Sequence, residues 1–272
     1  NYDYGFSDKK FKTDISMNYR FGEYRTGSLS LSAFNKLTTL CEDAIDYSSL
    51  TSTLTSLLGK YDFRDYYYSK GFEVNIAEDI LPFLRLGIGF KNVTDNNSLN
   101  NSDFSILNRS KTYNENKPVY ETKINLITAS FIVDFRKYIE DTYSRRRITQ
   151  GNSYMLLRGA VTHSSKSLLN SKNNFHSYSM KLYGDIPTFK SARMVYELEG
   201  FHTTGELPYQ MMYSLPGNIE SAGKPFTFRT LRPTEIFGDN GVIFNAEHNF
   251  NDELFRLLKI PYLKDWQLIL TG

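Results

Sequence analysis

The sequence has almost no cysteine, since Cys41 is the single one among 272 residues. One thiol excludes an intrachain disulfide and argues against a cysteine-based metal site. The four histidines, His163, His176, His202 and His248, lie far apart in the sequence and show none of the spacings that hold a metal ion. We therefore expect neither a bound metal nor a cofactor.

An excess of one charge is also lacking, because 32 Lys and Arg stand against 30 Asp and Glu, a net charge of +2. A balance this close gives no electrostatic reason to expect nucleic acid as a partner. The longest basic run is Arg145–Arg147. We expect it to lie in a solvated turn at the end of a strand, and phosphate binding is the weaker alternative.

Long apolar runs are missing too, and no stretch approaches the ~18 consecutive apolar residues of a membrane helix. This absence excludes helical spans alone, because in a transmembrane β-barrel every second residue faces inward. The chain also lacks a Gly-x-Ser-x-Gly elbow, a phosphate-binding glycine loop and a His-x-x-x-His motif. We expect no enzyme; a phospholipase that uses His176 and nearby serines on a barrel exterior is a minor alternative.

Aromatic residues are abundant: 20 Phe, 20 Tyr and one Trp make up 15% of the chain, yet the mean hydropathy is −0.44. This combination is typical of strands that have one apolar face and one polar face. Residues 11–21 are the clearest case, with Phe11, Ile15 and Tyr19 on one face and Arg20 on the other.

The same two-residue period predicts about ten strands. Several span about 10–14 residues, longer than the ~5–6 of an average soluble strand and enough for the ~9–11 tilted residues that cross a bilayer. The predicted strands lie within residues 11–21, 28–32, 71–77, 83–93, 121–136, 153–163, 176–183, 190–201, 242–250 and 265–270.

The connections between these strands alternate in length. Residues 21–27, 78–82 and 183–189 form short bends with Gly or Pro, whereas 36–63, 95–119 and 202–240 are long. Short turns at one end and long loops at the other are typical of an up-and-down outer-membrane barrel. In the first long loop, Leu50, Leu54, Leu57 and Leu58 have helical spacing, which predicts a short helix packed on the barrel rim.

A soluble β-sandwich or lipocalin-like barrel would show the same alternation. Three features favour the membrane form. The polar faces carry small residues such as Ser30 and Gly87, aromatic residues lie near the strand ends, and the long loops lie at one end. We predict an all-β fold, an antiparallel up-and-down transmembrane β-barrel. The chain starts at Asn1 and stops inside an apparent strand, so we expect residues 1–272 to be a fragment of one barrel domain whose closure needs further strands.

Residues 207–268 resemble the C-terminal barrel of an uncharacterised family of Gram-negative outer-membrane proteins. Members of that family often carry a carboxypeptidase-regulatory-like domain ahead of the barrel. The shared features are Leu207-Pro208, Gly217-Asn218, the run Phe228 to Asp239, the strand at 247–250 and the turn at 254–264. The family is similar in layout to the BamA/TamA assembly-factor superfamily, in which a late loop folds into the lumen.

In that superfamily an arginine on the loop pairs with a carboxylate on a following strand, although the "RGF" triplet of the pattern is here replaced by "FRTLRP" (228–233). The resemblance implies that loop 202–240 can fold into the lumen and close an arginine–glutamate latch. The alternative is that its arginines are solvated on an extracellular loop. The candidate latch residues are Arg229 and Arg232 on the loop and Arg193, Glu197, Glu199 and Glu247 on the polar faces of strands.

Two further expectations concern charges. Glu247 and His248 are adjacent on a predicted strand, so they face opposite sides and cannot form an acid–base pair. The polar faces carry charges of both signs, which indicates a lumen filled by ion pairs, since buried charges need partners. A water-filled pore without strong ion selectivity is the weaker alternative.

We expect an outer-membrane β-barrel protein of a Gram-negative bacterium, with a role in envelope biogenesis or in the translocation or assembly of other molecules. The alternatives are a passive pore or transporter and a soluble β-sheet binding protein. Expected partners are outer-membrane lipid and other envelope proteins, without nucleic acid, and the protein is expected to be a monomer.

Overall fold

A computed structural model describes residues 2–5, 9–41, 48–99, 103–148, 153–167, 170–219, 226–263 and 266–272. Parts of the predicted loops, at 42–47, 100–102, 149–152 and 220–225, lie outside the described residues, as does Asp265 at the start of the last predicted strand.

Eleven antiparallel strands form one sheet, and each strand pairs with the next member of the sheet along the chain. All ten predicted strands are present, which confirms the all-β, up-and-down architecture; the short β1 was not predicted. The strands are β1 (Tyr2–Gly5), β2 (Lys10–Phe21), β3 (Gly27–Thr39), β4 (Tyr66–Leu81), β5 (Leu84–Asn97), β6 (Thr122–Asp134), β9 (Tyr154–Ser164), β10 (Phe175–Pro187), β11 (Arg193–Gly205), β14 (Asn240–Asn251) and β15 (Leu268–Thr271).

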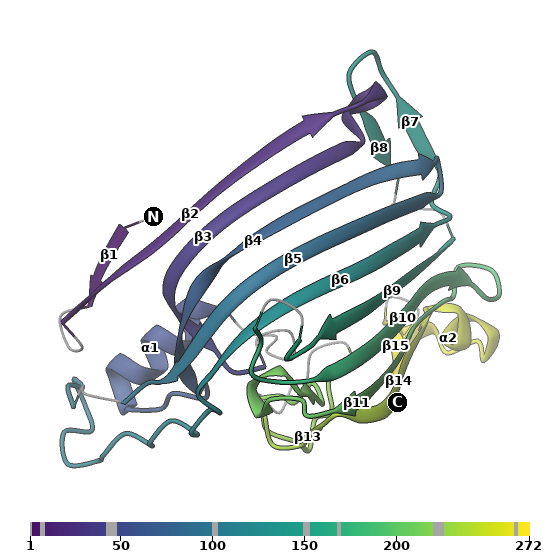
Figure 1. The fold of residues 1–272 in the computed structure, drawn as a ribbon. Coiled ribbons are helices and arrows are strands. Elements are labelled where there is room, and N and C mark those ends of the chain that lie inside the picture. Colours follow the sequence, from purple (N-terminus) through teal and green to yellow (C-terminus); the bar gives the residue numbers. More distant parts are fainter. Residues whose placement is uncertain are drawn as a thin grey trace.

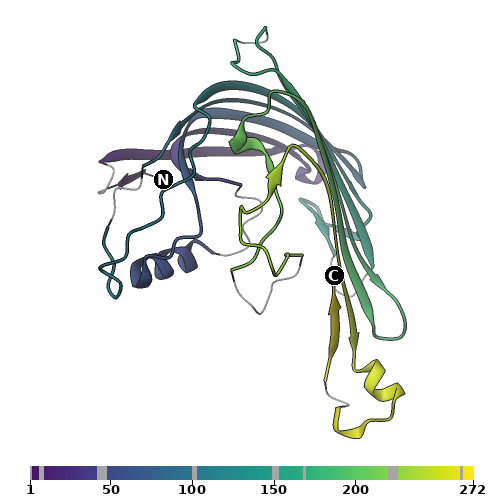
Figure 2. The ribbon, with the colours of Figure 1, turned by 90° about the horizontal axis from the view of Figure 1, so that it is seen from below.

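The sheet is strongly curved, and its strands run obliquely side by side (Figure 1). Seen from below, it forms an open arch with a convex outer face and a concave inner face (Figure 2). Within the described residues the edge strands β1 and β15 do not pair with each other, so the barrel is not closed. The segment that links β11 to β14 lies inside the arch (Figure 2).

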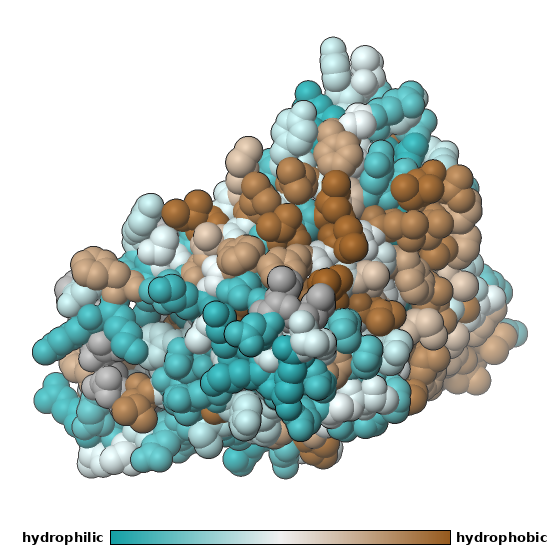
Figure 3. Space-filling model, in the orientation of Figure 1, coloured by the Kyte–Doolittle hydropathy of each residue, from teal (hydrophilic) through white to brown (hydrophobic). Residues whose placement is uncertain are grey.

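Apolar side chains cover the outer face of the sheet and are exposed there. The exposed fraction is 56% for Ile88, 57% for Phe244 and 75% for Val242. In the space-filling view, hydrophobic residues gather over the strands, and hydrophilic residues cover the lower left, near the long loops (Figure 3). Other exposed apolar residues of this face are Ile15, Met17, Leu31, Phe72, Ile76, Leu86, Val161, Met180 and Leu198.

A small apolar core lies on the concave side, near the long loops. Val93, Ile124, Leu126 and Phe175 form a buried cluster, and Leu207 from the segment inside the arch packs against it. Ile124 is fully buried. The one apolar cluster of this kind in the described part of the chain therefore joins β5, β6 and β10 to the inward segment, on the face opposite to Ile88.

The predicted short helix exists as α1 (Ser49–Gly59), and Ser48 caps it by accepting a hydrogen bond from the N–H of Thr51 at 3.2 Å. The predicted packing of its leucines was wrong. Leu50, Leu54, Leu57 and Leu58 are all exposed, whereas Ser52 is buried and donates to Asp62 Oδ1 at 3.3 Å. The helix therefore packs through its hydroxyl-bearing face.

The remaining elements lie in the connections. At the short-turn end are η1 (Glu23–Arg25), β7 (Tyr138–Glu140), β8 (Arg145–Arg147), α2 (Glu253–Leu257) and η4 (Pro261–Leu263); the segment inside the arch contains η3 (Tyr209–Met211), β12 (Tyr213–Ser214) and β13 (Phe237–Gly238). None of the helices in the described part of the chain has the length and apolar character that a membrane crossing requires.

The expectation of a solvated turn at Arg145–Arg147 was wrong for two of the three side chains. These residues form β8, which pairs with β7 in a separate hairpin. The side chain of Arg146 is 79% exposed, but those of Arg145 and Arg147 are 11% and 18% exposed. Tertiary contacts of this hairpin with the main sheet remove both guanidinium groups from water.

Truncation of Ile124 tests the concave core. We expect Ile124→Ala to lower the free energy of unfolding by about 2–5 kcal/mol, because it leaves a cavity between the sheet and the inward segment. The matched control is Ile88→Ala on the outer face, where detergent fills the space and no cavity remains. Urea unfolding in micelles measures both variants; equal losses would contradict this placement of the core.

Candidate functional site

The concave face carries the charged side chains of the strands, paired across neighbouring strands. Asp79 on β4 lies directly opposite Arg85 on β5, with a contact of 3.0 Å, and Lys181 on β10 lies directly opposite Glu199 on β11, at 3.4 Å. Opposite charges at facing positions of an antiparallel pair stabilise the register. The predicted ion pairs across the polar face are therefore present.

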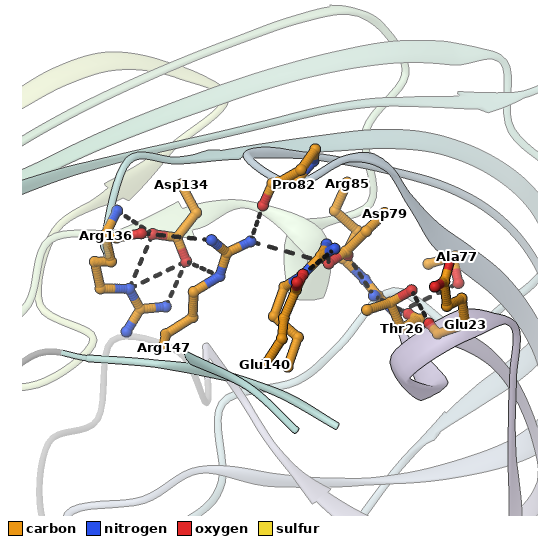
Figure 4. A network of polar contacts seen from close by, with 11 residues as sticks. Glu23, Thr26, Ala77, Asp79, Pro82, Arg85, Asp134, Arg136, Glu140 and Arg147 are labelled. Atoms are coloured by element: carbon orange, nitrogen blue, oxygen red, sulfur yellow. Dashed lines mark hydrogen bonds and ion pairs between the residues drawn. The ribbon is translucent and has the colours of Figure 1, made fainter. Parts of the chain in front are cut away.

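The densest part of this network surrounds Asp79 at the short-turn end (Figure 4). Its carboxylate lies 3.0 Å from Arg85 Nη1, 3.3 Å from Arg145 Nη1 and 3.9 Å from Arg147 Nη2. The Asp79 side chain is 12% exposed. One nearly buried carboxylate thus contacts three guanidinium groups, two of which come from the β7–β8 hairpin.

A second carboxylate, Asp134 at the end of β6, completes the network. Arg136 donates to it through Nε at 2.9 Å and Nη2 at 2.6 Å, the bidentate geometry that a planar guanidinium favours. Arg147 Nε lies 3.6 Å from the same carboxylate, and its Nη2 donates to the carbonyl of Pro82. Arg147 therefore ties the hairpin to the β4–β5 turn and to β6 at once.

Sequence reasoning missed this network as a site. A signal for one pair existed, since Asp79 and Arg85 lie on either side of the turn between β4 and β5 and pair directly across it. No local pattern placed Arg145 and Arg147 beside them, because 66 residues separate Asp79 from Arg145.

The segment between β11 and β14 packs against the concave face. Gln210 in η3 is 6% exposed, and its Nε2 donates to Asp95 Oδ2 at 3.1 Å and to the carbonyl of Tyr120 at 2.9 Å. The ring of Tyr213 stacks on Phe201 of β11 with centroids 4.4 Å apart. These contacts hold the start of the segment, which lies inside the arch (Figure 2).

Close backbone contacts fold this segment on itself. β12 and β13 pair in a two-stranded sheet, and Gly217 forms an isolated bridge with Phe228. A Cβ at Gly217 would lie 2.2 Å from the carbonyl oxygen of Arg232. Position 217 therefore needs a glycine for this approach. Lys117 Nζ, from the 98–121 connection, donates to the carbonyl of Thr234 at 2.7 Å.

Three of the predicted latch residues, all on β11, form ion pairs with the neighbouring strand β10. Lys181 Nζ lies 2.8 Å from Glu197 Oε1 and 3.4 Å from Glu199 Oε2, so one lysine engages both glutamates. Arg193 contacts Asp185 at 2.6 Å. Lys181 was not among the candidates, although its position opposite Glu199 follows from the strand register.

The loop arginines occupy different places. Arg229 and Glu247 line the same small cavity of about 190 Å³, near Asn245. Arg232 lines a separate cavity of about 840 Å³ near α1, and its backbone N–H donates to Glu235 Oε2 at 2.7 Å. Between described residues, neither arginine forms an ion pair with the three predicted glutamates. The latch stays a prediction, and Arg229 with Glu247 is its geometrically compatible pair.

Glu247 and His248 point to opposite faces, as their adjacency predicts. Glu247 lines the cavity on the concave side, whereas His248 Nε2 is 2.8 Å from Thr188 Oγ1 and its ring meets Phe250 edge-on. The two side chains therefore cannot act as an acid–base pair. In the described ranges, no group of three or more His, Cys, Asp or Glu side chains is arranged to hold a metal ion.

One protein family matches almost the whole chain, and a solved structure shows a distant likeness to it. A family described as "Family of unknown function (DUF5686) C-terminal domain" matches residues 1–271. A solved structure of BamA from Haemophilus ducreyi lacking POTRA domains 1–3 is similar, with a TM-score of 0.47 and 14% identity. That match covers 88% of this chain and 44% of the BamA chain, so the chain spans less than half of that protein. No curated protein matches the chain.

Replacement of Asp79 tests the network around it. We expect Asp79→Asn to lower the free energy of unfolding by about 3 kcal/mol, the lower end for a broken buried ion pair, because three guanidinium groups lose the carboxylate that they contact. The control is Glu206→Gln, whose pair with Lys166 is exposed, spans 3.2 Å and lies outside the hairpin, so a change below about 0.5 kcal/mol is expected. Urea unfolding gives the energies, and faster proteolysis of the β7–β8 hairpin in Asp79→Asn alone gives the location. Similar behaviour of the two variants would exclude Asp79 as the central residue.

Proposed function

The chain belongs to the DUF5686 C-terminal-domain family, a family of unknown function, and on this premise we propose that it is an outer-membrane β-barrel protein. Its proposed role is in envelope biogenesis, through the translocation or assembly of other molecules at the outer membrane. It acts without catalysis and without a cofactor. Its proposed environment is outer-membrane lipid of a Gram-negative bacterium, as a monomer that contacts other envelope proteins and no nucleic acid.

The exposed apolar outer face is the observation that carries the membrane proposal. Residues such as Met17, Ile88 and Val242 are more than half exposed, and they cover the sheet from β2 to β14. A soluble monomer rarely exposes an apolar surface this large. In a bilayer the apolar face would contact lipid chains instead of water. The backbone N–H and C=O groups already form hydrogen bonds within the antiparallel sheet.

Strand length supports the same proposal. The nine strands from β2 to β14 in the main sheet have 11–16 residues each. About 9–11 tilted residues suffice to cross the apolar part of a bilayer. The strands are thus long enough to span it and to extend into both interfaces.

The segment inside the arch favours a role in translocation or assembly over an open passive pore. Gln210 and Tyr213 fix the segment to the concave face, and its first residues pack against the apolar cluster that contains Ile124. A barrel with a packed segment in its lumen is poorly suited to free diffusion of solutes. A passive pore is the second candidate function, and conductance separates the two.

Labelling of single cysteines tests the orientation of the two faces. Cys41 is first replaced by serine, and single cysteines are then placed at Leu86, Phe244, Arg85 and Glu247. We expect lipid-phase probes to react at positions 86 and 244, and aqueous probes at 85 and 247, because neighbouring residues alternate across the sheet. The reverse pattern would contradict the face assignment. Expression as a soluble monomer without detergent would contradict the membrane proposal itself.

Single-channel recording of the full-length protein in planar bilayers tests the packed lumen. We expect little conductance from the wild type and more from Gly217→Val, because a side chain at 217 displaces the backbone at Arg232. The control is Gly200→Val, since a Cβ at Gly200 meets no atom within 4 Å. A stable ohmic pore in the wild type would favour the passive-pore alternative.

A further inference from the structure

We propose that the cavity at the short-turn end of the concave face binds a multiply charged phosphate-type anion. This inference goes beyond the proposed role and does not depend on it. The cavity has a volume of about 490 Å³ and lies between the sheet and the β7–β8 hairpin. Its lining comes from β2 to β6, from β9, from the η1 turn and from the hairpin, so residues distant in the sequence converge on it.

The charge of the cavity is strongly one-sided, although the whole chain is nearly neutral. Seven arginines line it, and the acidic lining residues are Asp79 and Asp134. Glu140 beside the cavity pairs with Arg145 at 2.6 Å and reduces the excess to four positive charges. Basic residues thus outnumber acidic ones at this end of the concave face, whereas the two are nearly equal in the whole chain.

The carboxylates of the network position the arginines, and some guanidinium N–H donors stay available for a ligand. Asp79 serves Arg85, Arg145 and Arg147, and Asp134 serves Arg136 as well as Arg147. Each guanidinium carries five N–H donors. The ion pairs and further bonds, of Arg85 to Thr26, Ser28 and Ala77 and of Arg147 to the carbonyls of Pro82 and Arg136, use most donors of these two arginines. Arg136 bonds to Asp134 through Nε and Nη2 and keeps its Nη1 donors for a ligand. Donors held in place before a ligand arrives lose little conformational entropy on binding.

Three further arginines, Arg20, Arg25 and Arg158, line the cavity outside this network, and two of them lie on strands of the sheet. Arg20 on β2 and Arg158 on β9 belong to the strands at opposite sides of the lining. No carboxylate of the described residues forms an ion pair with either side chain. Among the described residues, their guanidinium groups therefore have no carboxylate within 4.0 Å, and an anion in the cavity would supply a counter-charge.

The shape and chemistry of the donors select the class of anion. Guanidinium groups match the oxygen spacing of phosphate and bind it through paired N–H donors. A space of about 490 Å³ accepts a diphosphate or a phosphorylated headgroup, which is larger than a single halide. The shared chemistry is a phosphate ester or anhydride with two or more charges, either free in solution or on a lipid.

Calorimetric titration of the full-length protein in neutral detergent with inorganic pyrophosphate tests the site. We expect binding by the wild type, and a dissociation constant raised about tenfold or more in the double variant Arg20→Gln/Arg158→Gln, since two charge-assisted contacts are lost. These two arginines lie outside the ion-pair network, so the variant keeps the fold, which far-ultraviolet circular dichroism checks. The matched control is Arg109→Gln, an exposed residue of the connection between β5 and β6, for which unchanged binding is expected.

A second arm distinguishes the two sources of the anion. The titration is repeated in nanodiscs of phosphatidylglycerol and of phosphatidylcholine at equal ionic strength. Weaker pyrophosphate binding in phosphatidylglycerol assigns the site to a lipid headgroup, and equal binding assigns it to a soluble phosphate. The proposal is overturned if the wild type does not bind pyrophosphate, if the double variant binds as tightly as the wild type, or if hexaglutamate binds as tightly as pyrophosphate.

Discussion

The pairing of each long strand with the next antiparallel neighbour is the constraint on which this structure depends. It satisfies the backbone within the sheet, so that one whole face can be apolar and exposed without leaving polar groups unpaired. It also fixes the register, and the register decides which charges meet on the concave face. Asp79 faces Arg85 and Lys181 faces Glu199 because of their ladder positions, without any contribution from a specialised loop.

The distribution of apolar contacts follows from the same constraint. Most large apolar side chains point away from the arch, and the buried cluster is small and lies where the inward segment meets β5, β6 and β10. The concave side is otherwise polar and rich in ion pairs. Loss of one partner would destabilise the fold, because it would leave a nearly buried charge without a counter-charge. The two ends of the concave face therefore differ: the long-loop end is closed by packing, and the short-turn end is a basic cavity held open by paired arginines.

Much of the fold could be predicted from the sequence, because alternation is a local property. The period of two placed Leu86 and Phe244 on one face and Arg85 and Glu247 on the other, and it split Glu247 from His248. The helical spacing of the leucines correctly indicated α1, but it suggested a packed leucine face, whereas polar contacts of Ser52 bury the other side. Sequence reasoning failed for Arg145 and Arg147, which looked like a solvated run and instead contact Asp79.

The candidate site was less predictable, since its residues meet through the path of connections across the arch. The sequence alone determined the strands, their order and the polarity of each face, because these depend on neighbours two residues apart and on short turns. The tertiary structure alone decided that Lys181 engages Glu197 and Glu199, that Arg229 rather than Arg232 lines the same cavity as Glu247, and that a hairpin closes an arginine-lined cavity. The physical reason is that sheet curvature and loop packing bring together side chains whose spacing in the sequence carries no period.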